Sequence, residues 1–380
     1  MEQKRLGDIA TYINGYAFKP EDRGSTGLPI IRIQDLTGNA YDLGFYDGKY
    51  PEKIEINDGD VLISWSASLG VYIWNRGKGL LNQHIFKVVF DKCEVNKQYF
   101  VFAVKYKLKE MELKTHGATM KHIVKKDFDN TVIPFPTVEK QADIAYILSK
   151  IESIVEFRQQ ELQQLDDLIK ARFVEMFGDM YLNSKGWPEA KLESMADVVS
   201  GITKGRKTKA EDLTEVPYMA VSNVKDGYID WTTVKTIEAT QQEIEQYRLL
   251  ADDVLMTEGG DPDKVGRGAI IKEPLENCIH QNHIFRVRLD ESMILPEFFA
   301  EYLQHQRSKR YFLGCAKQTT GIASINMTQL RALPVLMPPL PKQEEFVLFK
   351  AQVNKSKVAV QKALDETQLL FDSLMQEYFG

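Results

Sequence analysis

Cys278, His280 and His283 have the side-chain types and the close spacing of a zinc site. A thiolate and two imidazoles are common ligands of tetrahedral zinc. Only His283 has a counterpart in the first half of the chain, His84, and a metal site in a duplicated protein would be expected in both halves. We therefore expect no metal to be bound by these residues.

Two further motifs suggest nucleic-acid chemistry but are incomplete. Asp261-Pro262-Asp263 could supply the acidic residues of a nuclease, but no Glu-x-Lys follows on a predicted strand. Pro134-Phe135-Pro136 lacks the Asn or Asp with which a methyltransferase grips a flipped base. The sequence also has no glycine-rich cofactor loop, serine elbow or phosphate loop. It therefore predicts a chain that is not itself an enzyme.

Positive charge is concentrated in stretches that lack Asp and Glu, although the whole chain has a net charge of −6. These stretches are residues 113–126, 201–210 and 302–343, and their cations include Lys114, Lys121, Lys204, Arg206, Lys207 and Lys317. Local positive surfaces on an acidic protein can bind a polyanion. The alternative for any one stretch is a solvated face without a ligand. The first and last stretches occupy equivalent positions in two halves of the chain, which favours binding.

These halves are copies of one another. Residues 83–88, Gln-His-Ile-Phe-Lys-Val, recur as residues 282–287, Asn-His-Ile-Phe-Arg-Val. Pro136, Lys140 and Gln141 recur as Pro338, Lys342 and Gln343, and both copies end in Phe-Gly, at Phe177-Gly178 and Phe379-Gly380. A duplicated domain indicates two similar functions performed at two places on one partner.

Each copy is predicted to begin with a mainly β domain and to end with a long helix. Short apolar runs rich in β-branched residues predict strands at residues 29–33, 61–64, 71–74 and 85–90. Residues 96–111 and 296–312 are predicted as equivalent helices, and prolines at 134–136 and 334–341 interrupt regular structure. Residues 139–178 and 341–380 carry apolar heptads, in rows that include Leu148, Val155, Leu162 and Ile169, then Val353, Val360 and Phe371. We expect the two helices to pair as an antiparallel coiled coil.

The composition is that of a soluble globular protein, with 43% hydrophobic and 27% charged residues. No run is long and apolar enough to span a membrane, and no signal-peptide core follows Met1. Cys93, Cys278 and Cys315 occupy no equivalent positions in the two copies, so we expect reduced thiols. A cytoplasmic location is expected.

The order of these parts resembles the specificity subunit of type I restriction-modification enzymes. Each copy has an opening Leu and a glycine about nine residues later, a Val-Leu strand, a His before an apolar strand, a proline-rich elbow with Lys-Gln and a long helix. The resemblance covers essentially the whole chain. It implies an α/β (α+β) fold with target recognition domains at residues 1–138 and 179–340, alternating with spacer helices at 139–178 and 341–380.

The resemblance also implies a function and partners. Each recognition domain would read one half of a split double-stranded DNA target, while the helices set the spacing and dock two methyltransferase subunits. S-adenosylmethionine would act on those modification subunits, and ATP and Mg²⁺ on restriction subunits, with no cofactor on this chain. The alternative is a coiled-coil scaffold that binds other proteins and no DNA.

The candidate DNA-binding residues come from the polar stretch before each elbow, the basic stretches and the loops after matched strands. Gly lets backbone amides approach phosphates, Lys neutralises them, and Gln, Asn, Ser and Thr can read base edges. Glu258, Asp261 and Asp263 weaken a phosphate-facing role for their loop, but they permit acceptance of a hydrogen bond from a cytosine amino group. For His84 and His283 a structural role is favoured over base contact. The candidates are Ser64, Trp65, Gln83, Lys114, Thr115, Thr119, Lys121, Lys204, Arg206, Lys207, Thr257, Glu258, Gln281, Lys317, Gln318, Thr319, Thr320, Ser324 and Asn326.

Overall fold

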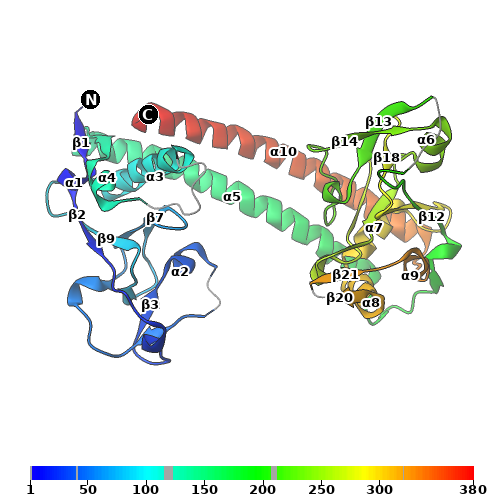
Figure 1. The fold of residues 1–380 in the computed structure, drawn as a ribbon, viewed down its shortest axis with the longest axis horizontal. Helices are drawn as coiled ribbons and strands as arrows, with labels where there is room; N and C mark the ends of the chain where they lie inside the picture. Colours follow the sequence, from blue (N-terminus) through cyan, green and yellow to red (C-terminus); the bar gives the residue numbers. More distant parts are fainter. Residues whose placement is uncertain (1, 40–41, 115–122, 207–211, 320) are drawn as a thin grey trace. The chain divides into compact units, whose positions relative to one another are not determined.

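The computed structural model describes residues 2–39, 42–114, 123–206, 212–319 and 321–380 (Figure 1). These fall into two compact units, of which unit 1 comprises Met1–Glu161 with Val360–Gly380, and unit 2 comprises Leu162–Ala359. The boundary lies inside two long helices, α5 (Val138–Phe177) and α10 (Leu340–Phe379). Within the described residues, no helix is both long and apolar enough to cross a membrane.

Unit 1 is built on a four-stranded antiparallel sheet in the order β2-β9-β6-β7 (Thr11–Asn14, Ile85–Val89, Val61–Ser64, Gly70–Ile73). A second sheet has the order β4-β3-β8-β5 (Phe45–Tyr46, Leu28–Ile31, Gly79–Leu81, Glu55–Ile56). A ribbon of β1 and β10 (Gln3–Arg5, Val132–Pro134) and the helices α1 to α4 complete the unit (Leu6–Ile9, Ile33–Thr37, Lys97–Lys114, Lys125–Asn130).

Unit 2 repeats this topology. Its main sheet has the order β12-β19-β15-β17 (Ala196–Ser200, Ile284–Leu289, Val254–Thr257, Gly268–Ile270), and a second sheet the order β14-β13-β18 (Lys235–Ala239, Thr214–Met219, Ile279–His280). Added to these are the β16-β21-β20 sheet (Gly259–Gly260, Ile322–Ser324, Lys317–Thr319) and the β11-β22 ribbon (Glu189–Lys191, Pro334–Leu336). The helices are α6 to α9 (Gln241–Tyr247, Pro296–Gln304, Gln306–Cys315, Met327–Arg331). The expected duplication and the mixed α/β class are confirmed.

In each unit, part of α5 packs against part of α10, and both contribute apolar faces to one core. The two helices run in opposite directions (Figure 1). In unit 1, Leu148 packs in the same buried cluster as Phe371 and Phe379. In unit 2, the corresponding cluster contains Phe173 and Phe346. The paired long helices predicted from the heptads are therefore present, each beginning one residue earlier than expected.

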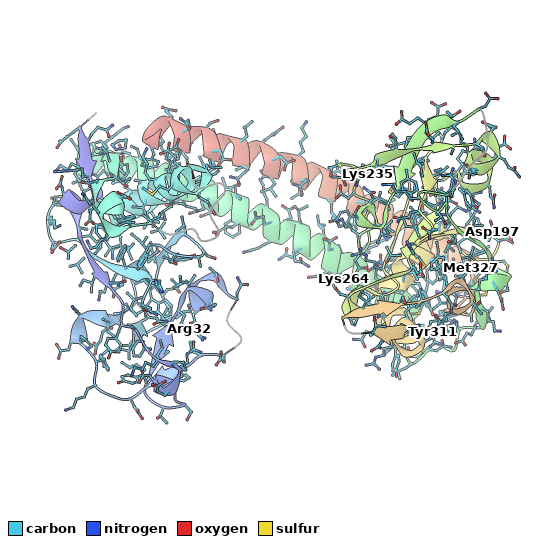
Figure 2. All side chains as sticks on the ribbon, in the orientation of Figure 1. Arg32, Asp197, Lys235, Lys264, Tyr311 and Met327 are labelled. Carbon is cyan, nitrogen blue, oxygen red and sulfur yellow. The ribbon has the colours of Figure 1, made fainter. Side chains whose placement is uncertain are left out.

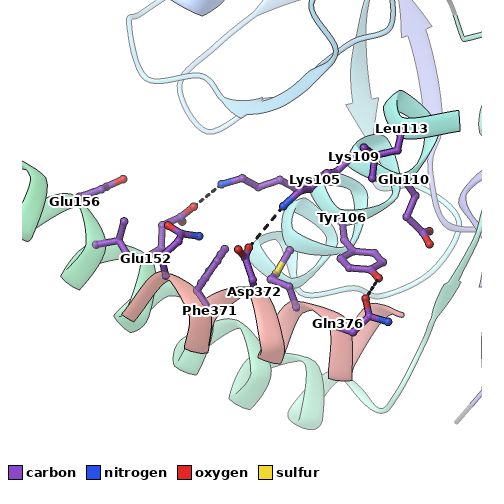
Figure 3. A pocket seen from close by; sticks show the side chains of 13 residues that line it. Lys105, Tyr106, Lys109, Glu110, Leu113, Glu152, Glu156, Phe371, Asp372 and Gln376 are labelled. Atoms are coloured by element: carbon purple, nitrogen blue, oxygen red, sulfur yellow. Dashed lines mark hydrogen bonds and ion pairs between the residues drawn. The ribbon is translucent and has the colours of Figure 1, made fainter. Parts of the chain in front are cut away.

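Polar contacts also tie α3 to both long helices in unit 1. Lys105 Nζ lies 2.6 Å from Glu152 Oε1 on α5, and the Tyr106 hydroxyl donates to Gln376 Oε1 on α10 at 2.5 Å (Figure 3). These contacts border a groove of about 510 Å³ whose lining mixes acidic, basic and apolar side chains. Of the candidate DNA-binding residues whose side chains the structure describes, none lines it.

Two lysines of α10 form ion pairs inside unit 2. Lys350 Nζ lies 2.7 Å from Glu301 Oε2 on α7, and Lys357 pairs with Asp166 on α5. These pairs let two cations occupy positions beside the helix interface.

The helix predicted at residues 296–312 is broken, unlike α3 in unit 1. His305 adopts an extended conformation (φ −82°, ψ 155°) and separates α7 from α8. The His305 ring is half-buried and stacks on Phe173, with centroids 4.3 Å apart. The tertiary contact with α5 therefore overrides the local helical pattern.

In the repeated Lys-Gln of each elbow, the glutamine side chain is buried and joins the β domain to its helix. Gln141 Nε2 donates to the Pro136 carbonyl at 2.9 Å, and its Oε1 accepts from the Asn96 amide at 2.9 Å, just before α3. Gln343 makes the same pair of contacts, to Pro338 at 2.8 Å and Leu295 at 2.8 Å. Both glutamines are fully buried, so each contact is shielded from water.

We predict that Gln141→Met destabilises unit 1 by roughly 1–3 kcal/mol, because it keeps the side-chain volume but leaves a buried donor and acceptor unpaired. Gln343→Met is the matched variant for unit 2. Urea denaturation measures the loss, and hydrogen exchange should accelerate at the Asn96 amide in one variant and at the Leu295 amide in the other. Wild-type stability and protection in both variants would show that these bonds contribute nothing.

Candidate nucleic-acid interface

The same backbone arrangement occurs at the end of the third sheet strand in both units. In unit 1, the Trp65 amide donates to the His84 carbonyl at 3.2 Å, and the Trp65 carbonyl accepts from the Ile123 amide at 3.0 Å. In unit 2, Glu258 makes equivalent bonds, to His283 at 3.0 Å and from Ile325 at 2.8 Å. We call this arrangement the backbone clamp. It brings together the end of a strand, the turn before the next strand and the segment that leads into α4 or α9.

A close backbone approach fixes the turn beside each clamp. A Cβ atom on Gly15 would lie 1.9 Å from the Asn82 carbonyl oxygen, and a Cβ on Gly201 would lie 1.9 Å from that of His280. Only glycine fits at these two equivalent positions. The opening glycine of each repeat therefore has a structural explanation.

The side chains on the two clamps differ. Trp65 packs against the core of unit 1, with its ring centroid 4.9 Å from that of His84 and 5.5 Å from that of Phe86. Glu258 instead places Oε2 2.5 Å from His283 Nδ1, and the two side chains are 35% and 55% exposed. The structure thus assigns an exposed polar contact to His283, a residue for which the sequence favoured a structural role. In the sequence, the signal for this contact was Glu258, the glutamate that directly follows β15.

Unit 2 has an exposed hairpin next to its clamp. Lys317, Gln318 and Thr319 of β20 are exposed, and β21 pairs with β16 through Ser324 and Gly259. A Cβ on Gly259 would lie 2.9 Å from the Ala323 carbonyl oxygen, so glycine is required for this pairing.

The segment that follows the hairpin is held by capping and by a neighbouring helix. Asn326 Oδ1 accepts from the Gln329 amide at 2.9 Å and so caps α9, while the Asn326 side chain remains exposed. The Tyr311 hydroxyl donates to the Gln329 carbonyl at 2.8 Å and ties α8 to α9. Figure 2 labels Tyr311 on α8 and Met327 on α9. Glu258, Lys317, Ser324 and Asn326, which are distant in sequence, thus belong to one local group of strands and turns.

Two candidate residues are buried and differ from expectation. Ser64 and Thr257 were expected in exposed loops, but both end their strands and are fully buried. The Ser64 hydroxyl donates to the Ser68 carbonyl at 2.5 Å. Neither side chain reaches the surface, because the strands continue through these positions.

The two candidate glutamines Gln83 and Gln281 also differ from one another. Gln83 is exposed. Gln281 is half-buried, and its Oε1 accepts from the Val221 amide at 3.3 Å. Gln281 therefore supports the neighbouring turn.

Several cations of the basic stretches are engaged within unit 2. Arg206 donates two hydrogen bonds to the Glu243 carboxylate, at 2.6 and 2.5 Å, and these bonds hold the pKa of Glu243 below its ordinary value. Arg307 pairs with Glu189, and Lys309 lies 3.2 Å from Asp226. Lys204 and Lys317 are exposed and make no ion pair with the part of the chain that the structure describes. Exposed, unpaired cations are the ones best suited to a polyanion.

Some candidates lie outside the described residues, namely Thr115, Thr119, Lys121, Lys207 and Thr320. Lys114 is the last residue of α3.

The Cys278, His280 and His283 side chains do not converge on a metal site. Both ring nitrogens of buried His280 lie near backbone carbonyls, Nδ1 at 3.0 Å from Tyr247 and Nε2 at 3.4 Å from Val199. Among the residues that can be described, no group of His, Cys, Asp and Glu is arranged to hold a metal ion.

Comparison with known proteins identifies the family. The family described as the type I restriction modification DNA specificity domain matches residues 1–167 and 184–366. The chain belongs to this family. It therefore belongs with the DNA specificity subunits of type I restriction-modification systems, as its sequence resemblance implied.

Individual specificity subunits match over nearly the whole chain. The EcoBI specificity subunit of Escherichia coli is 22% identical, covering 98% of this chain and 83% of the relative. The StySPI specificity subunit of Salmonella potsdam is 24% identical, with 98% and 86% covered. A crystal structure of the type I restriction-modification S subunit from M. genitalium shares the fold, with a TM-score of 0.56, 15% identity, and 100% and 96% covered.

A second solved structure, described as the basis of complex assembly and conformational transition of the type I R-M system, has a TM-score of 0.58 and 16% identity. It covers 99% of this chain and 96% of that one. Specificity subunits are thus a family whose members form part of multisubunit type I complexes.

We predict that His280 makes the folded specificity subunit sensitive to acid. Burial lowers its pKa from 6.5 to about 4. Between these values the unfolded chain binds a proton that the folded chain excludes, so the free energy of unfolding falls as the pH falls. The full effect of this residue is about 3 kcal/mol and is complete below pH 4.

The residue at the equivalent strand position in unit 1 is Leu81, so His280→Leu is a natural control. Urea denaturation from pH 7 to pH 4 should show a shallower decline in the free energy of unfolding for this variant. The carbonyls of Tyr247 and Val199 lose their His280 partner in this variant at every pH. Parallel pH profiles for the variant and the wild type would refute the assignment.

Proposed function

We propose that each unit of this specificity subunit reads one half of a bipartite double-stranded DNA target and that the chain catalyses no reaction itself. S-adenosylmethionine would be used by methyltransferase subunits, and ATP and Mg²⁺ by restriction subunits. Membership of the DNA specificity family favours this function over a scaffold that binds only proteins. The observation that carries the proposal is the backbone clamp, which occurs in both units with different side chains.

The hairpin of unit 2 supplies chemistry that suits DNA. Lys317 offers an exposed positive charge for a phosphate, and Gln318 and Thr319 offer exposed groups that can donate or accept at base edges. A two-stranded ribbon also fits the major groove of B-form DNA. We therefore assign the hairpin and the clamp to the DNA-facing side of unit 2.

Lys317→Ala is expected to weaken binding to every duplex and to reduce the slope of log affinity against log salt by about 0.9, because one phosphate contact is lost. Fluorescence anisotropy of the full chain with duplexes at several salt concentrations measures both quantities. Lys191→Ala is a control for an exposed lysine on a strand outside the hairpin, because the Lys191 side chain on β11 is 67% exposed and its Nζ lies 3.6 Å from Glu193 Oε1.

The comparison with Arg206→Ala is equally informative. Because the Arg206 guanidinium is paired with Glu243, its removal should leave the salt slope unchanged. An unchanged slope for Lys317→Ala, or equal slopes for Lys317→Ala and Lys191→Ala, would contradict the proposed DNA face.

The long helices offer a repeated surface for the methyltransferase. In unit 1, Tyr146 on α5 and Leu370 on α10 are 66% and 51% exposed. In unit 2, the residues at the corresponding helix positions are Leu348 on α10 and Leu168 on α5, and they are 68% and 46% exposed. Exposed apolar side chains that recur in both copies favour two similar protein-binding sites. We propose that one modification subunit docks on each unit.

Native mass spectrometry of the co-expressed proteins should then give two methyltransferase subunits for one copy of this chain. Tyr146→Glu or Leu348→Glu should each yield a complex with one methyltransferase, and the double variant should bind none, because a charge in an apolar interface is strongly unfavourable. A wild-type complex with a single methyltransferase at saturation, or two retained in the double variant, would overturn this arrangement.

A further inference from the structure

We propose that Glu258 recognises the exocyclic amino group of a cytosine in the major groove and that His283 positions its carboxylate. This inference rests on the DNA-reading function proposed for unit 2. It names the base chemistry of one position in one half-site and adds a positioning residue that was not among the candidate DNA-binding residues.

The geometry leaves one carboxylate oxygen of Glu258 available to a ligand. The clamp fixes the Glu258 backbone on both sides, through His283 and Ile325. Glu258 Oε2 is bonded to His283 Nδ1, whereas no described residue donates to Oε1. Since the side chain is 35% exposed, Oε1 can accept a hydrogen bond from outside the protein.

A carboxylate on a DNA-facing surface discriminates strongly among the four bases. It is repelled by phosphates, so it is compatible with binding only where it faces base edges and is accompanied by cations such as Lys317. An ionised carboxylate has acceptors and no donor. Guanine and thymine present acceptors to the major groove, and adenine places its N7 acceptor beside its amino group. Cytosine presents an amino donor without an adjacent acceptor, so it is the base that suits Glu258.

The contact with His283 holds the carboxylate in one place before DNA arrives. A free glutamate side chain loses up to about 2 kcal/mol of rotamer freedom when it is fixed, and a pre-formed hydrogen bond reduces this loss on binding. His283 is 55% exposed and lies in the turn before β19. It therefore restrains Glu258 without burying it.

Unit 1 offers an internal comparison. Trp65 occupies the equivalent clamp position and packs on His84 and Phe86 rather than presenting a charge. The same backbone position thus carries an acceptor in one unit and an aromatic ring in the other. Substitutions at Glu258 should change one half-site only.

The test uses the full chain assembled with its methyltransferase. Methylation-site mapping first defines the two half-sites, and competition binding then compares duplexes in which each C·G pair of the unit 2 half-site is replaced by T·A. We expect one C·G pair whose replacement weakens binding by at least about tenfold in the wild type. Glu258→Ala should lose this discrimination, and Glu258→Gln should shift it toward adenine, which suits an amide that both donates and accepts.

His283→Gln retains an N–H that can donate to Glu258 and should keep the preference for cytosine, whereas His283→Leu should weaken it. In all four variants, discrimination within the unit 1 half-site should remain as in the wild type, which also shows that each complex is folded. A unit 2 half-site without a C·G pair, or Glu258→Ala that still discriminates like the wild type, overturns the inference. Altered discrimination in both half-sites overturns it too, because Glu258 would then act on the structure as a whole. Failure of the wild-type complex to bind any duplex would instead refute the DNA-reading function itself.

Discussion

The structure depends on the burial of the apolar faces of two 40-residue helices. A helix with an apolar face is not stable alone in water and must pack against a partner. In unit 1 the core includes Phe371, Met375 and Phe379 from the end of the chain. In unit 2 it includes Phe346 and Val353 from the start of the same helix. Each domain therefore requires a piece of α10, so neither half of the sequence corresponds to one compact unit.

This requirement connects the helices to the candidate DNA surface. The buried amide of Gln141 joins the elbow before α5 to the Asn96 amide, which immediately precedes α3 and follows β9. β9 in turn begins directly after the His84 turn that forms part of the clamp. Within unit 1, a short path thus runs from the long helix through Gln141, Asn96 and β9 to the clamp, and Gln343 makes the corresponding contacts in unit 2. The surfaces proposed for docking and for recognition therefore share one core within each unit.

The sequence predicted the elements that follow from local pattern, and it missed those that depend on tertiary contacts. The duplication, the strand at residues 61–64 and both long helices are confirmed because hydrophobic periodicity and repeated motifs are local signals. The break at His305 arises from stacking on Phe173, which is distant in sequence. The pairing of Arg206 with Glu243 is also long-range, and it turned an apparent phosphate ligand into a structural residue. Charge counts along the chain cannot reveal such neutralisation.

The clamp also explains how one fold can carry two specificities. Its hydrogen bonds involve only backbone atoms of Trp65 and Glu258, so the side chain at this position can change without loss of the clamp. The side chains at the two positions nevertheless contribute differently to the stability of their units. Trp65 packs against the unit 1 core, and removing a large aromatic from such a site costs up to about 3–5 kcal/mol, whereas Glu258 is partly exposed and contributes little packing. Unit 2 is therefore the half in which this position can change at low cost to folding, and unit 1 is the half in which a change of side chain must be accompanied by repacking around Phe86.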